Sequence, residues 1–296
     1  MSGTVLVRAQ AKINLRLKVL GLLESGYHAI ETVFLRLELA DRITIATAGG
    51  GGVDLDVTGD PSLVAASGPA DRNLAVTAAK AYAERTGWRP HVAISIEKMI
   101  PVGTGLGGGS ADAAAVLRGL DALAPSPLPR AELLALAATI GSDVPFLAGD
   151  DVMAMGLGRG ERLMPLPPLP VRPVILAVPP VHVSTRDAYE WLGRARGEAP
   201  APPNMPGDAF ASWEDAAGHA QNDFSEAVAQ RHPVVRKIRE SLLERGARIA
   251  MLTGSGSAVF GIFDSEPPDT SESGDGDWRE IRTATAAHVV PVERMD

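Results

Sequence analysis

Residues 101–110 read Pro101-Val102-Gly103-Thr104-Gly105-Leu106-Gly107-Gly108-Gly109-Ser110. They join an expected strand at 91–96 to an expected alanine-rich helix at 110–123, and five of the seven positions 103–109 are glycine. Glycines let a backbone approach an anion closely, and the first turn of a helix adds unpaired N–H groups and the positive end of its dipole. A tight turn alone rarely needs so many glycines. The stretch therefore predicts a phosphate-binding loop.

Three common phosphate-binding patterns fit this loop poorly. Gly103, Gly105 and Gly108 match G-x-G-x-x-G, but a second expected helix at 130–140 follows where a dinucleotide fold would continue into a strand. A P-loop would end in Gly-Lys-Ser/Thr, whereas positions 109–111 hold glycine, serine and alanine. The H-R-D and D-F-G segments of protein kinases are absent from the sequence. None of these three patterns therefore accounts well for the loop.

The composition is that of a globular protein. The chain has 296 residues, of which 45% are apolar and 22% charged, and a formal net charge of −8. This charge argues against broad binding to nucleic acid or to an anionic membrane. No cysteine is present, which excludes disulfides and thiolate nucleophiles, and the histidines have no metal-ligand spacing. With no long apolar segment, we expect a cytoplasmic protein without a structural metal.

Strand patterns dominate the first part of the chain. Apolar residues occupy every second position from 5 to 19, which predicts a strand with one polar face. The glycine run at 49–52 suggests a hairpin turn, with 53–57 returning as a strand. A helix is expected at 73–85, and a second glycine turn at 254–256 lies between expected strands at 248–252 and 258–263. The mixture predicts an α+β sandwich.

Proline marks the best domain boundary. The stretch 165–173 is proline-rich, which divides the chain into an expected first domain at 1–164 and a second at 165–296. In the second domain, 197–218 is expected to be a long loop, the acidic segment 265–277 a disordered insert, and 287–292 a closing strand.

Three separated segments resemble the GHMP kinases, which phosphorylate small alcohols with ATP. Residues 101–114 resemble the central motif of that family, 11–15 its N-terminal motif and 252–260 its C-terminal glycine motif. The three occur in the family's order and span most of the chain. The resemblance implies a two-domain α+β fold with the active-site cleft between the domains, and ATP bound with Mg²⁺ bridging its phosphates.

Shorter matches indicate one branch of the family. The segments at 26–28, 71–74, 141–145 and 222–223 resemble the branch that phosphorylates the 2-hydroxyl of a cytidine-diphosphate-linked sugar alcohol, on a route to isoprenoid precursors. Two alternatives stay open: a homoserine or mevalonate type of kinase, and a non-catalytic nucleotide-binding relative. The presence of both Lys12 and Asp143 argues against the second alternative.

The resemblance implies the catalytic residues. It makes Asp143 the base and puts Lys12 beside it, with Asn14 also lining the substrate end of the cleft. Pattern alone would place Lys12 and Asn14 on a solvated strand face. It would also make Ser142 or Asp143 the cap of a following helix, which is compatible with the catalytic role.

The resemblance also implies the cytidine contacts. Tyr27 would stack on the cytosine, His28 would hydrogen-bond its polar edge and Tyr189 would cover its other face, with Thr185 nearby. Pattern alone would treat a Tyr-His pair in a loop as ordinary surface. The expected partners are therefore a small-molecule substrate and ATP, without nucleic acid or membrane, in a monomer or homodimer.

For ATP, the resemblance implies that Asn73 contacts the adenine, although pattern alone makes it a helix N-cap. Ser110 is expected to be the N-cap of its helix. An acid at Asp112 would repel phosphates unless it points away from them or meets a cation. The expected ATP loop comprises Pro101, Gly103, Gly105, Leu106, Gly107, Gly108, Gly109 and Ser110.

Overall fold

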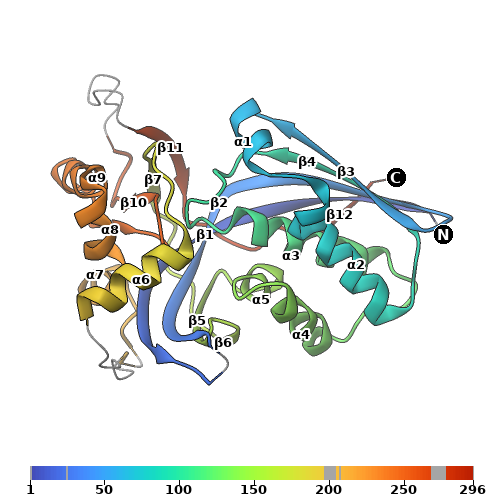
Figure 1. Cartoon of the computed structure of the whole chain (residues 1–296), viewed down its shortest axis with the longest axis horizontal. Coiled ribbons are helices and arrows are strands. Elements are labelled where there is room, and N and C mark those ends of the chain that lie inside the picture. Colours follow the sequence, from blue (N-terminus) through green and yellow to red (C-terminus); the bar gives the residue numbers. More distant parts are fainter. Residues whose placement is uncertain (1, 25, 197–204, 207, 268–277, 296) are drawn as a thin grey trace.

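The computed structural model describes residues 2–24, 26–196, 205–206, 208–267 and 278–295. Within these residues the strands form an eight-stranded and a four-stranded sheet, each covered by helices (Figure 1). The two termini lie at the same end of the molecule, far from the small sheet. The α+β architecture predicted from the sequence is confirmed.

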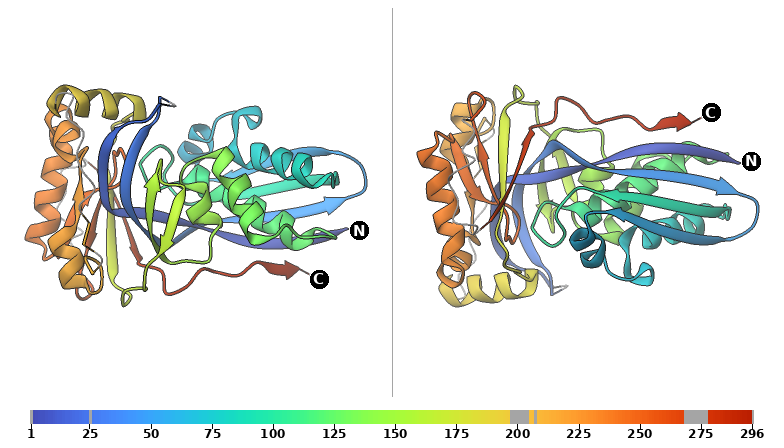
Figure 2. Two further views of the ribbon diagram at one scale, coloured as in Figure 1. Left: turned by 90° about the horizontal axis from the view of Figure 1, so that it is seen from below. Right: turned by 90° about the horizontal axis from the view of Figure 1, so that it is seen from above.

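The large sheet has the order β12-β1-β2-β4-β3, with β5 pairing with β2 and β6, and β8 pairing with β1. Its two longest strands, β1 and β2, run from the terminal end of the molecule to the small sheet (Figure 2). The strands are β1 (Gly3–Leu22), β2 (His28–Ala48), β3 (Gly52–Gly59), β4 (His91–Lys98), β5 (Met153–Gly158), β6 (Arg162–Pro165), β8 (Gln221–Asn222) and β12 (Glu293–Met295).

The small sheet is antiparallel, with the order β11-β7-β10-β9. The glycine turn at 254–256 joins β9 to β10, as the sequence predicts. The strands are β7 (Pro173–Val178), β9 (Ile249–Leu252), β10 (Val259–Ile262) and β11 (Arg279–Ala284).

The helices also form two groups, one beside the large sheet and one beside the small sheet. The first group is α1 (Pro61–Ala66), η1 (Ala70–Arg72), α2 (Leu74–Thr86), α3 (Gly108–Leu123), α4 (Arg130–Ile140) and α5 (Val144–Ala148). The second is α6 (Thr185–Arg196), α7 (Trp213–His219), α8 (Ser225–Arg231) and α9 (Pro233–Glu244). None of the described helices is long and apolar enough to cross a membrane.

Helix α3 sits close against the large sheet because its sequence is rich in alanine and glycine. A Cβ on Gly119 would lie 2.4 Å from Cδ1 of Ile45 and 3.2 Å from Cγ2 of Val5, so a side chain at this crossing would push Ile45 and Val5 out of their present positions. The apolar face of β1 and the buried face of α3 belong to one hydrophobic core. This packing fixes the start of α3, and with it the glycine loop, against β1.

Several local predictions are wrong. The turn at 49–52 does not close a hairpin, because β4 lies between β2 and β3 and pairs in parallel with β3. Residues 287–292 form no strand, and β12 at 293–295 pairs with β1 instead. Part of the expected loop 197–218 is helix α7. Residues 197–204 and 207, and 268–277 of the acidic segment, lie outside the described residues.

The polar face of β1 is exposed at Arg8 but is not solvated from Gln10 onward, which corrects the reading from pattern alone. Gln10, Lys12, Asn14, Arg16 and Lys18 are all buried. Polar side chains on this face are covered because Arg16 contacts His219 and Gln221, and the β9–β10 turn packs on Asn14. A division at 164/165 stays a prediction. Strands β8 and β12, which follow that point in the sequence, belong to the large sheet.

Candidate active site

Lys12 and Asp143 meet where β1 passes the start of α5. Lys12 Nζ lies 3.2 Å from Oδ2 of Asp143, and the two side chains are 4% and 30% exposed. The ammonium group is therefore buried behind a carboxylate that solvent can reach. Asp143 stands at the N-cap position of α5, but its side chain makes no capping hydrogen bond in the described residues. The carboxylate is thus directed at Lys12 instead of the helix.

The short helix α5 is held from its other end. Arg36, on β2, is 1% exposed and donates hydrogen bonds to the carbonyl oxygens of Leu147 at 3.1 Å and Gly149 at 2.9 Å. A cation at a helix C-terminus satisfies carbonyls that the helix leaves unpaired. Arg36 therefore fixes the helix that carries Asp143 in place.

Asn14 links Lys12 to the second glycine turn. Its Oδ1 accepts from Lys12 Nζ at 2.7 Å and from the N–H of Gly254 at 3.0 Å, while its Nδ2 donates to Thr32 Oγ1 at 2.8 Å. These partners define the orientation of the amide, since the oxygen faces two donors and the nitrogen an acceptor. Asn14 therefore holds the lysine and the turn together.

The glycine loop lies beside this network. The N–H of Lys12 donates to the carbonyl oxygen of Leu106 at 3.0 Å, which ties the loop to β1. A Cβ on Gly107 would lie 3.1 Å from Cε of Lys12, and one on Gly105 only 2.1 Å from the carbonyl oxygen of Thr253. Both glycines also have positive φ values of 76° and 86°. The two glycine turns thus touch each other and the lysine.

Helix α3 begins earlier than the sequence suggested. Its first residue is Gly108 and its N-cap is Gly107, so Ser110 lies in the first turn and is not the N-cap. Gly107 can serve as a cap because glycine adopts its left-handed conformation without strain. Among the other loop residues, Pro101 accepts from Thr104 Oγ1 at 3.0 Å, and Gly103 lies next to His182. The N–H groups of Gly108, Gly109 and Ser110 are the unpaired ones of the helix start.

At the other side of the site, the rings of His28 and Tyr189 are stacked, with centroids 4.2 Å apart and an angle of 13°. Burial and then the charge of Asp143 raise the pKa of Tyr189 to about 12. Tyr189 therefore lies within electrostatic reach of Asp143. Burial also lowers the pKa of His28, so its imidazole is neutral at pH 7.

Tyr27 lies apart from this stack. It is 57% exposed, and the guanidinium of Arg159 covers its ring at 5.0 Å. Thr185, one turn before Tyr189 on α6, lies 3.2 Å from Ser255 through the two hydroxyl oxygens. The structure thus brings Tyr189 together with His28, and Thr185 together with the second glycine turn.

Asn73 caps α2, as pattern alone indicates, since its Oδ1 accepts from the N–H of Ala75 at 2.9 Å. Asp112 does meet a cation: Lys98 Nζ donates to its Oδ2 at 2.8 Å. Among the described residues, no three histidine, aspartate or glutamate side chains are grouped as a metal site.

Two residues of the site have no role in the sequence-based prediction. Thr253 is fully buried, and its Oγ1 accepts from the N–H of Asn14 at 3.2 Å. Asn222 donates from Nδ2 to the carbonyl oxygens of Leu252 and Gly254, each at 2.8 Å. Both lie inside segments that resemble family motifs, and that position is the signal that could have pointed to them.

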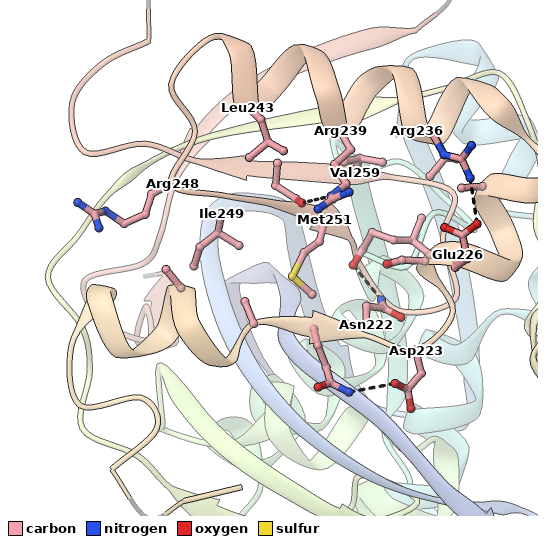
Figure 3. Close-up of a pocket in the computed structure, with 18 residues that line it drawn as sticks. Asn222, Asp223, Glu226, Arg236, Arg239, Leu243, Arg248, Ile249, Met251 and Val259 are labelled. Atoms are coloured by element: carbon pink, nitrogen blue, oxygen red, sulfur yellow. Dashed lines mark hydrogen bonds and ion pairs between the residues drawn. The ribbon is translucent and has the colours of Figure 1, made fainter. Parts of the chain in front are cut away.

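A separate pocket of about 410 Å³ opens beside β9, between β8 and α9 (Figure 3). Asn222 forms part of its wall, together with Arg236, which pairs with Glu226 at 3.0 Å, and Arg239, which donates to the carbonyl oxygen of Ala250 at 3.2 Å. None of the predicted site residues lines this pocket. Arg239 and Asn222 donate hydrogen bonds to the carbonyl oxygens of Ala250 and Leu252 on β9.

An acidic residue and a lysine thus meet beside two touching glycine turns. Residues 73–159 match the GHMP kinases N terminal domain, and residues 208–272 match the GHMP kinases C terminal domain. The chain belongs to the GHMP kinase family.

Two relatives cover most of the chain, and both are named 4-diphosphocytidyl-2-C-methyl-D-erythritol kinase. The protein from Chlorobium phaeobacteroides (strain BS1) is 39% identical over 260 residues, covering 87% of this chain and 88% of that protein. The protein from Anaeromyxobacter dehalogenans (strain 2CP-C) is 42% identical over 258 residues, covering 86% and 79%.

Solved structures agree with this placement. A crystal structure of 4-(cytidine 5'-diphospho)-2C-methyl-D-erythritol kinase matches with a TM-score of 0.76 and 35% identity, covering 95% of this chain and 98% of that one. Homoserine kinase from Cytophaga hutchinsonii matches with a TM-score of 0.67 at 15% identity, covering 99% and 97%. The second likeness shows the shared fold alone.

Proposed function

We propose that this chain is a kinase that transfers the γ-phosphoryl group of ATP to the 2-hydroxyl of 4-diphosphocytidyl-2-C-methyl-D-erythritol. The products are the 2-phosphate and ADP, and the reaction belongs to isoprenoid precursor biosynthesis. The observation that carries the proposal is the Lys12–Asp143 pair, set between the glycine loop and Tyr189. The relatives' names supply the particular alcohol.

Asp143 is the proposed catalytic base. Its accessible carboxylate can accept a hydrogen bond from the attacking hydroxyl and take the proton as the bond to phosphorus forms. Lys12, 3.2 Å from that carboxylate, orients it and brings positive charge to the centre where phosphoryl transfer occurs. Asn14 keeps the lysine in position through its 2.7 Å hydrogen bond.

The glycine loop is the proposed ATP phosphate site. The first turn of α3 presents the N–H groups of Gly108, Gly109 and Ser110, and the glycines before it let the loop backbone pack directly against Thr253 and Lys12. Mg²⁺ would come with the nucleotide, and it would neutralise part of the negative charge of the phosphates. Asn73 is proposed to contact the adenine.

The aromatic pair is the proposed cytosine site. A cytosine that stacks on the face of Tyr189 covered by His28 requires the imidazole to turn aside. His28 can then hydrogen-bond the base edge, with Tyr27 available as a second stacking ring. Thr185 lies one turn from Tyr189 on the same side of α6 and is the proposed neighbour of the substrate there. We further propose a cytoplasmic monomer or homodimer.

The test measures ADP release by the purified chain with Mg²⁺ and ATP. The alcohols are the cytidine-diphosphate-linked methylerythritol, methylerythritol phosphate without the cytidylyl group, homoserine and mevalonate. We expect turnover with the first alone. Turnover with homoserine or mevalonate would transfer the assignment to another branch of the family. ATP binding without turnover of any alcohol would favour a non-catalytic relative.

A further inference from the structure

Three buried charged side chains meet directly behind the glycine loop. Lys98 Nζ donates to Oδ2 of Asp41 at 2.6 Å and to Oδ2 of Asp112 at 2.8 Å. The side chains of Lys98, Asp41 and Asp112 are 2%, 0% and 4% exposed. They come from β4, β2 and α3, so the cluster joins three elements that are distant in sequence.

The cluster holds both ends of the loop. Lys98 is the last residue of β4, before the loop, and Asp112 lies in the second turn of α3, after it. Oδ1 of Asp41 also accepts from the N–H groups of Met99 at 2.6 Å and Ile100 at 2.8 Å. A Cβ on Gly108 would lie 3.5 Å from Lys98 Nζ, so the ammonium group adjoins the first residue of α3.

The charges in the cluster are not balanced by simple pairing, since one lysine faces two carboxylates. Burial first, and then the charge of Asp41, raise the pKa of Asp112 to about 8, although Lys98 opposes this. Burial tends to lower the pKa of Lys98, but the two carboxylates outweigh burial and raise it. Oδ1 of Asp112 has no hydrogen-bond partner in the described residues, whereas Asp41 has three donors. Asp112 is therefore the group that holds a proton at pH 7.

We propose that Asp41, Lys98 and Asp112 are positioning residues for ATP, which clamp both ends of the glycine loop and keep a net charge of zero behind the phosphates. The inference rests on the proposed function, because it needs ATP at this loop. Loss of the Asp112 proton leaves the cluster with one net negative charge beside Gly108. In a buried, low-dielectric position such a charge repels the nucleotide phosphates.

The experiment is calorimetric titration of ATP with Mg²⁺, without the alcohol, from about pH 7 to about pH 9. Wild type and three variants are compared: Asp112→Asn, Lys98→Met and Asp121→Asn. The last is a matched control on the same helix, since Asp121 contacts Tyr82 and Leu128, away from the loop. Thermal unfolding of each variant shows whether it is folded.

We expect the affinity of wild type and Asp121→Asn to fall about three- to tenfold over this range, because Asp112 ionises. Asp112→Asn keeps the shape and stays neutral, so it should bind as wild type does at about pH 7 and show no such fall. Lys98→Met should bind ATP weakly throughout. If Lys98→Met does not fold, the pH profile of Asp112→Asn decides alone.

The same pH dependence in wild type and Asp112→Asn would overturn the clamp while leaving the proposed function intact. An Asp112→Asn variant that binds ATP much more weakly than wild type at about pH 7 would also overturn the clamp. A neutral side chain at position 112 would then not be enough to maintain ATP binding. Absence of ATP binding by wild type would overturn the proposed function and this inference with it.

Discussion

At the scale of single residues, the site depends on contacts that give ordinary side chains a defined role. Asp143 lies two residues after Gly141 and directly before a helix, a setting typical of a cap, yet its carboxylate faces Lys12. Lys12 is buried and has two oxygen partners, Asp143 and Asn14. A buried ammonium group placed between them is held in one orientation, as phosphoryl transfer requires.

Asp143→Asn should lower kcat by about 10²–10⁴ while the KM for ATP changes little, because the shape is kept and the base is removed. Lys12→Ala should also lower kcat, and the double variant should lose less than the two losses combined, since the pair acts as a unit. Initial rates of ADP release measure this. Asp150→Asn, an exposed acid just beyond α5, is the control and should be fully active. A fully active Asp143→Asn enzyme would remove the base role.

His28→Ala should narrow the preference for the cytidine substrate over its uridine analogue, because the neutral imidazole is the proposed reader of the base edge. Tyr189→Ala should weaken substrate binding by about 1–3 kcal/mol through lost stacking. Substrate titrations of both variants with the two nucleotides check these values. Equal discrimination by wild type and His28→Ala would contradict the role of His28.

At the scale of elements, the glycine loop is determined by the elements that it touches. Gly105 lies against the turn after β9, and Gly107 lies against the lysine of β1. Glycine is needed at both positions for close approach as well as for positive φ. The loop is therefore a packed part of the structure, held at its ends by β4 and α3.

Gly107→Val should weaken ATP binding and lower kcat, because its side chain would meet Lys12 and adopt an unfavourable φ. Gly109→Ala is the matched control for folding, as the nearest atom to its Cβ is Leu74 Cδ1 at 3.8 Å. Calorimetry and thermal unfolding measure both variants. Unchanged ATP affinity in Gly107→Val would contradict the loop assignment.

Asp112 should make the stability of the protein depend on pH. Its pKa is raised from 3.8 to about 8, so the folded state keeps a proton that the unfolded chain releases above about pH 4. This group therefore lowers the free energy of unfolding as the pH rises from about 4 to about 8. Denaturant unfolding should show a smaller decrease in Asp112→Asn than in wild type over that range. If the free energy of unfolding depended on pH in the same way in wild type and Asp112→Asn, the raised pKa of Asp112 would be contradicted.

At the scale of the whole molecule, the two sheets are joined through β1 and β8. Strand β8 pairs in parallel with β1, and Asp223 accepts from the N–H of Val19 at 2.7 Å. Asn222 then bonds two carbonyls at the end of β9 and in the glycine turn. The long strand and the small sheet are thus connected by side chains of one short segment.

Asn222→Ala should reduce stability by about 1–3 kcal/mol, because it leaves the carbonyl oxygens of Leu252 and Gly254 without their donor. We also expect a higher KM for the substrates, since the turn at 254–256 contacts both Asn14 and Thr185. Denaturant unfolding and initial rates measure these effects. Gln230→Ala, a surface amide on α8, is the control. If Asn222→Ala had the same free energy of unfolding as wild type, the hydrogen bonds from Asn222 to Leu252 and Gly254 would not contribute to stability.

The sequence by itself determined the features that depend on neighbouring residues. The glycine loop, the alternation in β1, the helix at 130–140 and the N-cap at Asn73 all follow from local pattern, and the structure has them. The motif resemblance predicts the family and places Lys12 beside Asp143, and both predictions are confirmed. These predictions succeed because turns, caps and periodic burial depend on residues only a few positions apart.

Only the tertiary structure decided the features that depend on distant residues. Strand β4 separates β2 from β3, although the turn at 49–52 suggested a hairpin. Residues 219–221 and the second glycine turn cover Arg16 and Asn14 on the polar face of β1. Asp112 meets Lys98, and His28 stacks on Tyr189, through contacts between separate elements. Strand partners and buried charges depend on which surfaces meet in three dimensions, and local periodicity carries no information about that choice.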